Sequence, residues 1–160
     1  MIVDLRTIPQ DASRHFELRL NRDWWHSDEQ DDQIIGIGAP ITASVDIYKA
    51  GDKYVLEGDM DGHLKIRCDR CLRPYENEIK TEFKLFFTKP TRYAGKGETE
   101  LLEEDMEMEF IDGEEINLDD IFREQLYLSL PIKSLCREDC RGLCPLCGAD
   151  LNIQTCKCKK

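Results

Sequence analysis

Paired cysteines constrain this chain more than any other feature of its sequence. Of its eight cysteines, six lie in the last 26 residues, LCREDCRGLCPLCGADLNIQTCKCKK, and two lie far upstream in CDRCLRP. Such a pattern indicates a disulfide framework, a redox centre or metal sites. Two thiolates two residues apart can bind one tetrahedral ion if the turn between them is tight, and Pro145 and Gly148 favour such a turn in CPLCG.

Nothing in the sequence predicts export or a membrane span. The start, MIVDLRTIPQDASR, has no basic segment followed by an apolar one, and no apolar run approaches the roughly 18 residues of a membrane span. We therefore expect a protein of the reducing cytoplasm with no membrane partner. In that compartment, clustered cysteines more often bind metal or do redox chemistry than form stable disulfides.

The composition of the clusters favours structural zinc. A catalytic zinc keeps one open position, commonly beside a histidine or a carboxylate, whereas a four-thiolate site is closed. The three histidines are scattered with no motif around them. We therefore expect two structural Zn²⁺ ions, no catalytic residue and no enzymatic activity, with redox chemistry, disulfides and an iron–sulfur cluster as alternatives. The predicted ligands form four pairs, which are Cys68 with Cys71, Cys136 with Cys140, Cys144 with Cys147, and Cys156 with Cys158.

Spacing leaves open how these four pairs divide between two sites. In the favoured arrangement the first pair joins the second, and the third joins the fourth. In another, the first pair joins the third, as in a zinc ribbon built from two knuckles. A further arrangement joins the second pair to the third and leaves the rest less engaged.

The cysteine-rich tail should not fold without metal. From Leu135 onward it has only five apolar residues besides cysteine and alanine. Burying such side chains contributes roughly 2 kcal/mol each at best, while ordering each residue costs about 1–2 kcal/mol. A structural zinc can contribute on the order of 10 kcal/mol to a small module.

The rest of the chain predicts a mixed β fold, an antiparallel meander or barrel, with one main helix. Alternating apolar and polar residues predict strands over 16–20, 41–49, 53–60, 63–68, 75–87 and 106–110. In the last of these strands, Met106, Met108 and Phe110 should face inward. The first cysteine pair would then lie at the tip of a β-hairpin.

The main helix should begin after Asn117, a good N-cap, and end before Pro131. Its buried residues should be Leu118, Ile121, Phe122 and Leu126. We expect a β-rich domain over 1–131, closed by this helix, and a zinc-knuckle module over 132–160 packed on the hairpin tip at 68–71.

The formal net charge of −11 is concentrated in one segment. Between Glu98 and Asp120 there are twelve acidic residues and no Lys or Arg, so the remainder is close to neutral. The net charge therefore does not exclude a nucleic-acid partner. The segment could dock a basic protein, although a solvated strand and loop is the favoured interpretation. Trp24 and Trp25 could stack on bases or on a protein, although such a pair is more often at least half buried.

Taken together, several motifs resemble the bacterial YceD family, also called the large ribosomal RNA subunit accumulation proteins. They are CDRCL after a strand, LPIKSLC closing a helix, DCRGLCPLCGADLN and a final C-x-C, in that order. The resemblance covers essentially the whole chain, and the family's shared cysteines map onto the eight named above. It implies a non-enzymatic accessory factor for accumulation of large-subunit ribosomal RNA, through processing or early assembly. That RNA or its precursor particle, and a ribosomal protein, are the implied partners.

Basic residues around the cysteines are candidates for RNA contact. If a zinc joins the hairpin to the tail, these cations converge on one surface that could contact phosphates. Alternatively, they balance the negative charge of the zinc–thiolate clusters. A protein-binding adaptor without RNA contact, and a thiol enzyme or redox sensor, are the competing functions. The candidates are Arg67, Arg70, Arg73, Arg137, Arg141, Lys157, Lys159 and Lys160, with Lys133 beside them.

Overall fold

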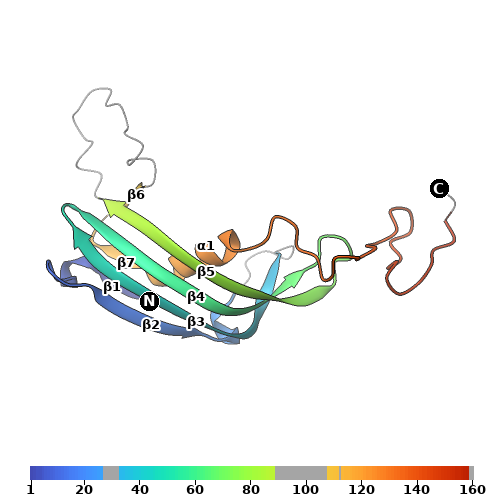
Figure 1. Ribbon diagram of the computed structural model, residues 1–160, viewed down its shortest axis with the longest axis horizontal. Helices are drawn as coiled ribbons and strands as arrows, with labels where there is room; N and C mark the ends of the chain where they lie inside the picture. The colour runs from blue at the N-terminus through green and yellow to red at the C-terminus, as the bar shows by residue number, and fades with distance from the viewer. Residues whose placement is uncertain (27–32, 89–107, 112, 159–160) are drawn as a thin grey trace, which may run out of the picture. The chain divides into compact units, whose positions relative to one another are not determined.

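The computed structural model describes residues 1–26, 33–88, 108–111 and 113–158. Across these residues the protein is mostly β, with α1 (Leu118–Leu128) as its α-helix (Figure 1). Two 3-10 turns, η1 (Leu5–Thr7) and η2 (Arg22–Trp24), lie near the N-terminus. The strands are β1 (Ile2–Asp4), β2 (Arg14–Leu20), β3 (Ile34–Ala50), β4 (Lys53–Arg67), β5 (Pro74–Thr88), β6 (Met108–Phe110) and β7 (Glu115–Asn117).

The main sheet is open. Its five strands follow the order β2-β3-β4-β5-β6, so among the described residues β2 and β6 are the two edges. The expected meander is thus present from β2 to β5, but the alternative of a barrel was wrong. The last pairing is also not antiparallel, because β6 runs parallel to β5, with Phe86 opposite Met108 and Thr88 opposite Phe110.

Two strands are longer than the sequence predicts. β3 begins at Ile34 rather than Ile41, and β4 runs through Gly62, where two strands were expected. Gly62 does not break the strand, because it permits a close approach of the neighbouring backbone. A Cβ at Gly62 would lie 2.8 Å from the Cα of Ile41.

A small second sheet holds the start of the helix. β1 pairs antiparallel with β7, with Val3 opposite Ile116, a pairing that the sequence analysis did not predict. Asn117 follows this pair and caps α1, its side-chain oxygen accepting a hydrogen bond from the amide of Asp119 at 3.2 Å. The predicted N-cap is therefore confirmed.

The helix packs with one apolar face. The four residues predicted to be buried are all buried, and Gln125 joins them. Phe122, which is fully buried, meets the ring of Phe83 of β5 edge-on, with ring centroids 6.3 Å apart. Such an edge-to-face pair adds to the stability gained from burial alone.

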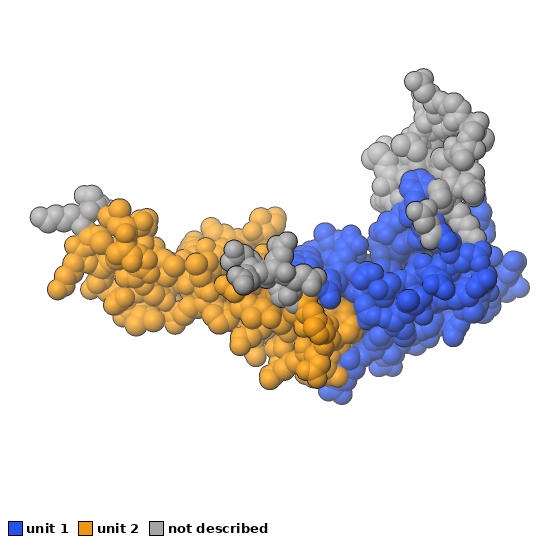
Figure 2. All heavy atoms as spheres, turned by 180° about the vertical axis from the view of Figure 1, so that it is seen from behind, with its two compact units in different colours: residues 1–19, 42–60, 80–128 blue, residues 20–41, 61–79, 129–160 orange. Residues whose placement is uncertain are grey.

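By its internal contacts the chain divides into two compact units, drawn in different colours in Figure 2. Unit 1 comprises 1–19, 42–60 and 80–128, and unit 2 comprises 20–41, 61–79 and 129–160. Each has its own buried apolar residues, Ile47, Leu56, Met60 and Phe122 among those of unit 1, and Leu20, Ile34, Ile41, Leu64 and Ile66 among those of unit 2. A domain boundary at residue 131 stays a prediction.

Not every expected inward side chain is buried. Phe110 at the end of β6 is 54 % exposed, so its predicted inward orientation was wrong. Phe110 lies on the short strand β6, which is an edge of the sheet among the described residues. Met106 and residues 98–107 and 112 of the acidic segment lie outside the described residues, and so does the side chain of Met108, so the predicted orientations of both methionines stay predictions. No helix among the described residues is long and apolar enough to cross a membrane.

Candidate metal centres

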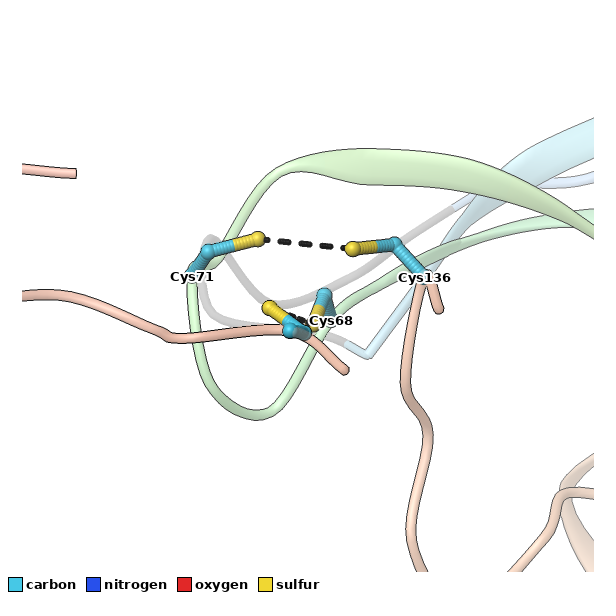
Figure 3. Close-up of side chains that lie close together, drawn as sticks. Cys68, Cys71 and Cys136 are labelled. Carbon is cyan, nitrogen blue, oxygen red and sulfur yellow. Dashed lines mark hydrogen bonds between the residues drawn. The ribbon is translucent and has the colours of Figure 1, made fainter. Parts of the chain in front are cut away.

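The hairpin tip between β4 and β5 brings the first two cysteine pairs together. Cys68 and Cys71 come from the tip, and Cys136 and Cys140 come from the chain beyond α1. The Sγ atoms of Cys68 and Cys140 lie 3.8 Å apart, and those of Cys71 and Cys136 lie 3.7 Å apart. Figure 3 shows the latter two sulfurs pointing at each other, with the sulfur of Cys68 beside them. We call these four residues the first cluster.

The spacing of these sulfurs fits a tetrahedral ion. A zinc–sulfur bond is about 2.3 Å long, so the edge of a regular tetrahedron of sulfurs around zinc is about 3.8 Å. A disulfide would require about 2.05 Å, and all eight cysteines are free. Three of the four side chains of the first cluster are buried and the fourth is partly buried, as expected of a closed site.

The second cluster is local to the tail. Cys144, Cys147, Cys156 and Cys158 bring their sulfurs within 4.8 Å of one another. Cys144 is buried, whereas Cys147 is exposed. The structure thus groups the cysteines in the first of the three arrangements that spacing left open, and each group of four could hold a metal ion.

The two C-x2-C pairs form equivalent turns, which we call knuckle turns (68–72 and 144–148). In each, the amide of the fifth residue donates to the carbonyl of the first cysteine, from Leu72 to Cys68 and from Gly148 to Cys144, both at 2.9 Å. In each, that fifth residue has a left-handed backbone, with φ of 58° at Leu72 and 70° at Gly148. The tight turn that Pro145 and Gly148 predict is therefore present twice.

These turns stabilise a thiolate at the first position. Burial alone would raise the pKa of Cys68, but backbone amides of Cys136, Cys71 and Arg70 hydrogen-bond its sulfur and hold the pKa at about 6. In the second turn, the amides of Leu146 and Cys147 lower the pKa of Cys144 to about 6. Both turns aim the amides two and three residues after the first cysteine at its sulfur.

Two other thiols, one in each cluster, are harder to ionise than a free cysteine. Burial and the neighbouring sulfurs raise the pKa of Cys136 to about 12. The neighbouring Cys147 and then burial raise the pKa of Cys158 to about 12. A positive ion among the sulfurs would lower the cost of ionising these two thiols, which is the chemistry of a four-cysteine metal site.

A polar contact places the second pair beside the hairpin tip. Ser134, which is fully buried, donates its amide to Asp69 Oδ2 at 2.6 Å, and its carbonyl accepts the amide of Asp69 at 2.8 Å. Its hydroxyl accepts a hydrogen bond from Gln33 Nε2 at 2.7 Å. These contacts fix the chain two residues before Cys136, and the sequence analysis identified neither Asp69 nor Ser134.

The tail folds back onto the first cluster through Asp150 and Asn152. Leu143 and Asp150 form an antiparallel bridge, and the amide of Leu143 donates to the carbonyl of Arg70 at 3.0 Å. Nδ2 of Asn152 lies 3.5 Å from the sulfur of Cys140. Asp150 and Asn152 in GADLN are residue types that favour turns, so a turn could have been predicted there from the sequence. The contact of Asn152 with Cys140 of the first cluster could not.

Three of the candidate RNA-contacting arginines make contacts within unit 2. Arg70 donates to the carbonyl of Cys140 at 2.7 Å. Arg73 pairs with Asp150 at 2.8 Å. Arg137 pairs with Asp139 at 3.3 Å and donates to Asn152 at 2.8 Å.

The other candidates differ in their surroundings. Arg67 is partly buried, whereas Arg141 and Lys157 are exposed. For the side chains of Arg141 and Lys157, the described part of the chain provides no hydrogen bond or ion pair, although the backbone amide of Arg141 donates to Asn152. Lys159 and Lys160 lie outside the described residues. RNA contact by any of these cations stays a prediction.

The tryptophan pair is mostly enclosed. Trp25 is buried and Trp24 is partly buried, with their ring centroids 6.2 Å apart. Of the two, only Trp24 has appreciable surface with which a base or a protein could stack.

The described residues thus define a mostly β protein with two four-cysteine clusters that could each hold a metal ion. A sequence model of one family, described as large ribosomal RNA subunit accumulation protein YceD, matches residues 56–160. The chain belongs to the YceD family, as its motifs indicated. The family is named for accumulation of an RNA and not for an enzymatic activity.

Curated relatives are distant. An uncharacterized protein of Mycobacterium leprae is 27 % identical over 121 residues, covering 76 % of this chain and 54 % of the relative. The chloroplastic large ribosomal RNA subunit accumulation protein YCED homolog 1 of Zea mays is 26 % identical over 143 residues, covering 75 % and 49 %. The chain thus spans about half the length of these two relatives.

A third relative is covered more fully. An uncharacterized protein of Mycobacterium tuberculosis is 28 % identical over 154 residues, covering 94 % of this chain and 70 % of the relative. No solved structure matches the chain.

Proposed function

We propose that this protein is a zinc-stabilised, non-enzymatic factor for accumulation of large-subunit ribosomal RNA, acting in its processing or early assembly. Membership of the YceD family carries the RNA part of the proposal. The Zea mays relative, whose name states the same role, supports it. The precursor particle of the large subunit, with a ribosomal protein in it, is the proposed partner.

Two structural zinc ions are the proposed cofactors. Thiolates are soft ligands that suit zinc, and four of them fill its tetrahedral shell, so no position remains for a substrate. The sulfur separations of 3.7 and 3.8 Å in the first cluster support a tetrahedral ion. The exposure of Leu146 (67 %) and Ile153 (72 %) supports a tail with too small a core to fold by itself. Each zinc would supply the charge that keeps four thiolates together, and the protein's residues would position them.

The proposed RNA contact is made by exposed cations of unit 2. Arg141 and Lys157 are the best candidates, because they are exposed and their side chains have no described internal partner. Arg70, Arg73 and Arg137 would instead support the tail, through their contacts with Cys140, Asp150 and Asn152. Reversing the charge of those three residues would therefore disturb the fold of the tail as well as any contact with RNA.

Charge reversal at two exposed residues tests this assignment. The double variant Arg141→Glu, Lys157→Glu should bind fragments of large-subunit ribosomal RNA more weakly, with a shallower dependence of affinity on salt, because two phosphate contacts are lost. The variant Lys65→Glu, also at an exposed lysine of unit 2, is the control. Equal affinity and salt dependence in the double variant and the control would contradict the RNA contact.

A protein-binding adaptor without RNA contact is the second candidate function. It is favoured by the internal contacts of Arg70, Arg73 and Arg137, which leave fewer cations for phosphates. Crosslinking in cells, followed by sequencing of any attached RNA, separates the two. The proposed function predicts crosslinks to large-subunit ribosomal RNA, whereas the adaptor predicts crosslinks to protein alone.

A further inference from the structure

Asn152 belongs to the loop of the second cluster, but its side chain contacts Cys140 of the first cluster. Its Nδ2 donates to Cys140 Sγ at 3.5 Å and to Asp150 Oδ1 at 2.8 Å. Its Oδ1 accepts hydrogen bonds from Arg137 Nη2 and from the amide of Arg141, both at 2.8 Å. The residue thus contacts a cysteine of the first cluster and the segment that leads up to and away from that cysteine.

The same loop also holds the hairpin tip. Asp150 pairs with Arg73, which follows the first knuckle turn, at 2.8 Å. The amide of Leu151 donates to the carbonyl of Gly142 at 2.9 Å. A Cβ at Gly142 would lie 2.9 Å from the carbonyl oxygen of Arg70, so glycine is needed for this close approach.

We infer that the two cysteine clusters bind metal cooperatively, with Asn152 as the positioning residue that couples them. The inference rests on the proposed binding of two zinc ions. Residues 144–158 contain both cysteine pairs of the second cluster and little apolar material, so a metal in that cluster orders the loop. The ordered loop then presents Asn152 to Cys140.

The coupling acts through a hydrogen bond to a ligand atom. An N–H directed at a thiolate stabilises its negative charge and orients the sulfur, and such outer partners commonly change metal affinity by 10- to 100-fold. Because coupling between two binding sites is reciprocal, metal in the first cluster must favour metal in the second by the same factor.

A site-specific measurement tests the coupling in the full-length chain. Reduced, metal-free protein is equilibrated with buffered Zn²⁺, and alkylation of Cys68 and Cys71 is followed by mass spectrometry. The midpoint is the free zinc concentration at which these two thiols become half protected, and native mass spectrometry counts the zinc ions bound. Asn152→Ala should raise the midpoint about tenfold, the lower end of the range for such partners.

Removing the fourth cysteine pair completes the test. Cys156→Ser, Cys158→Ser should raise the midpoint for Cys68 and Cys71 although neither residue belongs to the first cluster. In that background Asn152→Ala should have no further effect. Gln154→Ala is the matched control, because it removes an exposed amide side chain from the same loop.

The outcomes separate the coupling from the zinc sites. If Asn152→Ala or the loss of Cys156 and Cys158 leaves the midpoint unchanged, the cooperative inference is overturned. The proposed zinc sites would still stand if the wild-type chain binds two zinc ions. A wild-type chain that binds no zinc at any concentration would overturn the sites and the coupling together.

Discussion

Leu72 occupies in the first knuckle turn the place that Gly148 occupies in the second. Both residues donate their amides to the carbonyl of a cysteine at 2.9 Å, and both have a left-handed backbone. A side chain in this conformation costs about 1–2 kcal/mol, which glycine avoids. The first turn therefore carries a backbone cost that the second does not.

This difference predicts that alanine destabilises the second turn more than the first. Gly148→Ala should destabilise the zinc-loaded protein by about 1–2 kcal/mol through its backbone alone, since a Cβ there meets nothing within 4 Å. Leu72→Ala should cost much less, because the left-handed Cβ is already present and the side chain is 57 % exposed. Denaturant unfolding of both variants measures this, and equal losses would contradict the equivalence of the turns.

A second prediction concerns the junction between the tail and the hairpin tip. Gly142→Ala should cost more than a left-handed backbone alone, because its Cβ would also lie 2.9 Å from the carbonyl oxygen of Arg70. Amide hydrogen exchange should become faster over residues 143–152. Gly51→Ala is the control, since Gly51 has a similar φ of 66° and open space around it. Equal stability losses in the two variants would contradict the prediction, because they would show that the close approach of Gly142 to Arg70 adds no cost.

The main sheet offers a third prediction, at Gly58 of β4. A Cβ there would lie 2.6 Å from the ring of Phe83 and 2.7 Å from the carbonyl oxygen of Ser44. Gly58→Ala should therefore destabilise the protein by about 1–3 kcal/mol, the usual cost of overpacking. Gly36→Ala in β3, where nothing lies within 4 Å, should not destabilise it. Thermal unfolding compares the two, and a harmless Gly58→Ala would contradict the described packing.

Metal removal provides a fourth prediction. A strong chelator should remove hydrogen-exchange protection from residues 134–158, because the tail has only a few partly buried apolar side chains. The amides around Ile47 and Leu56 should stay protected, since both residues are fully buried in unit 1, which has its own core. Protection of the tail that survives complete metal removal would contradict a structural role for the metal.

The sequence predicted the elements whose signals are local. Asn117 before an apolar face predicted the cap and the buried residues of α1, and CPLCG predicted a knuckle turn with a left-handed Gly148. Alternation predicted β5 almost to its ends. Each of these signals depends on neighbours within a few residues.

The features that the sequence did not predict, or did not decide, depend on residues far apart in the chain. The sequence predicted two strands, 53–60 and 63–68, whereas the structure places Gly62 against Ile41 and β4 continues through it. The structure groups the cysteine pairs as in the favoured arrangement. Spacing alone could not exclude the alternatives, because contacts such as those of Ser134 with Asp69 and of Asn152 with Cys140 join residues far apart in the chain. The short strands β1 and β7 have little pattern of their own and form by pairing with each other.

X-ray absorption at the zinc edge, together with zinc content, tests the central claim most directly. Protein purified without chelators should contain two zinc ions per chain, each surrounded by four sulfurs at about 2.3 Å. Zinc below one ion per chain, nitrogen or oxygen in the shell, or a mass that reveals disulfides between these cysteines would contradict the account.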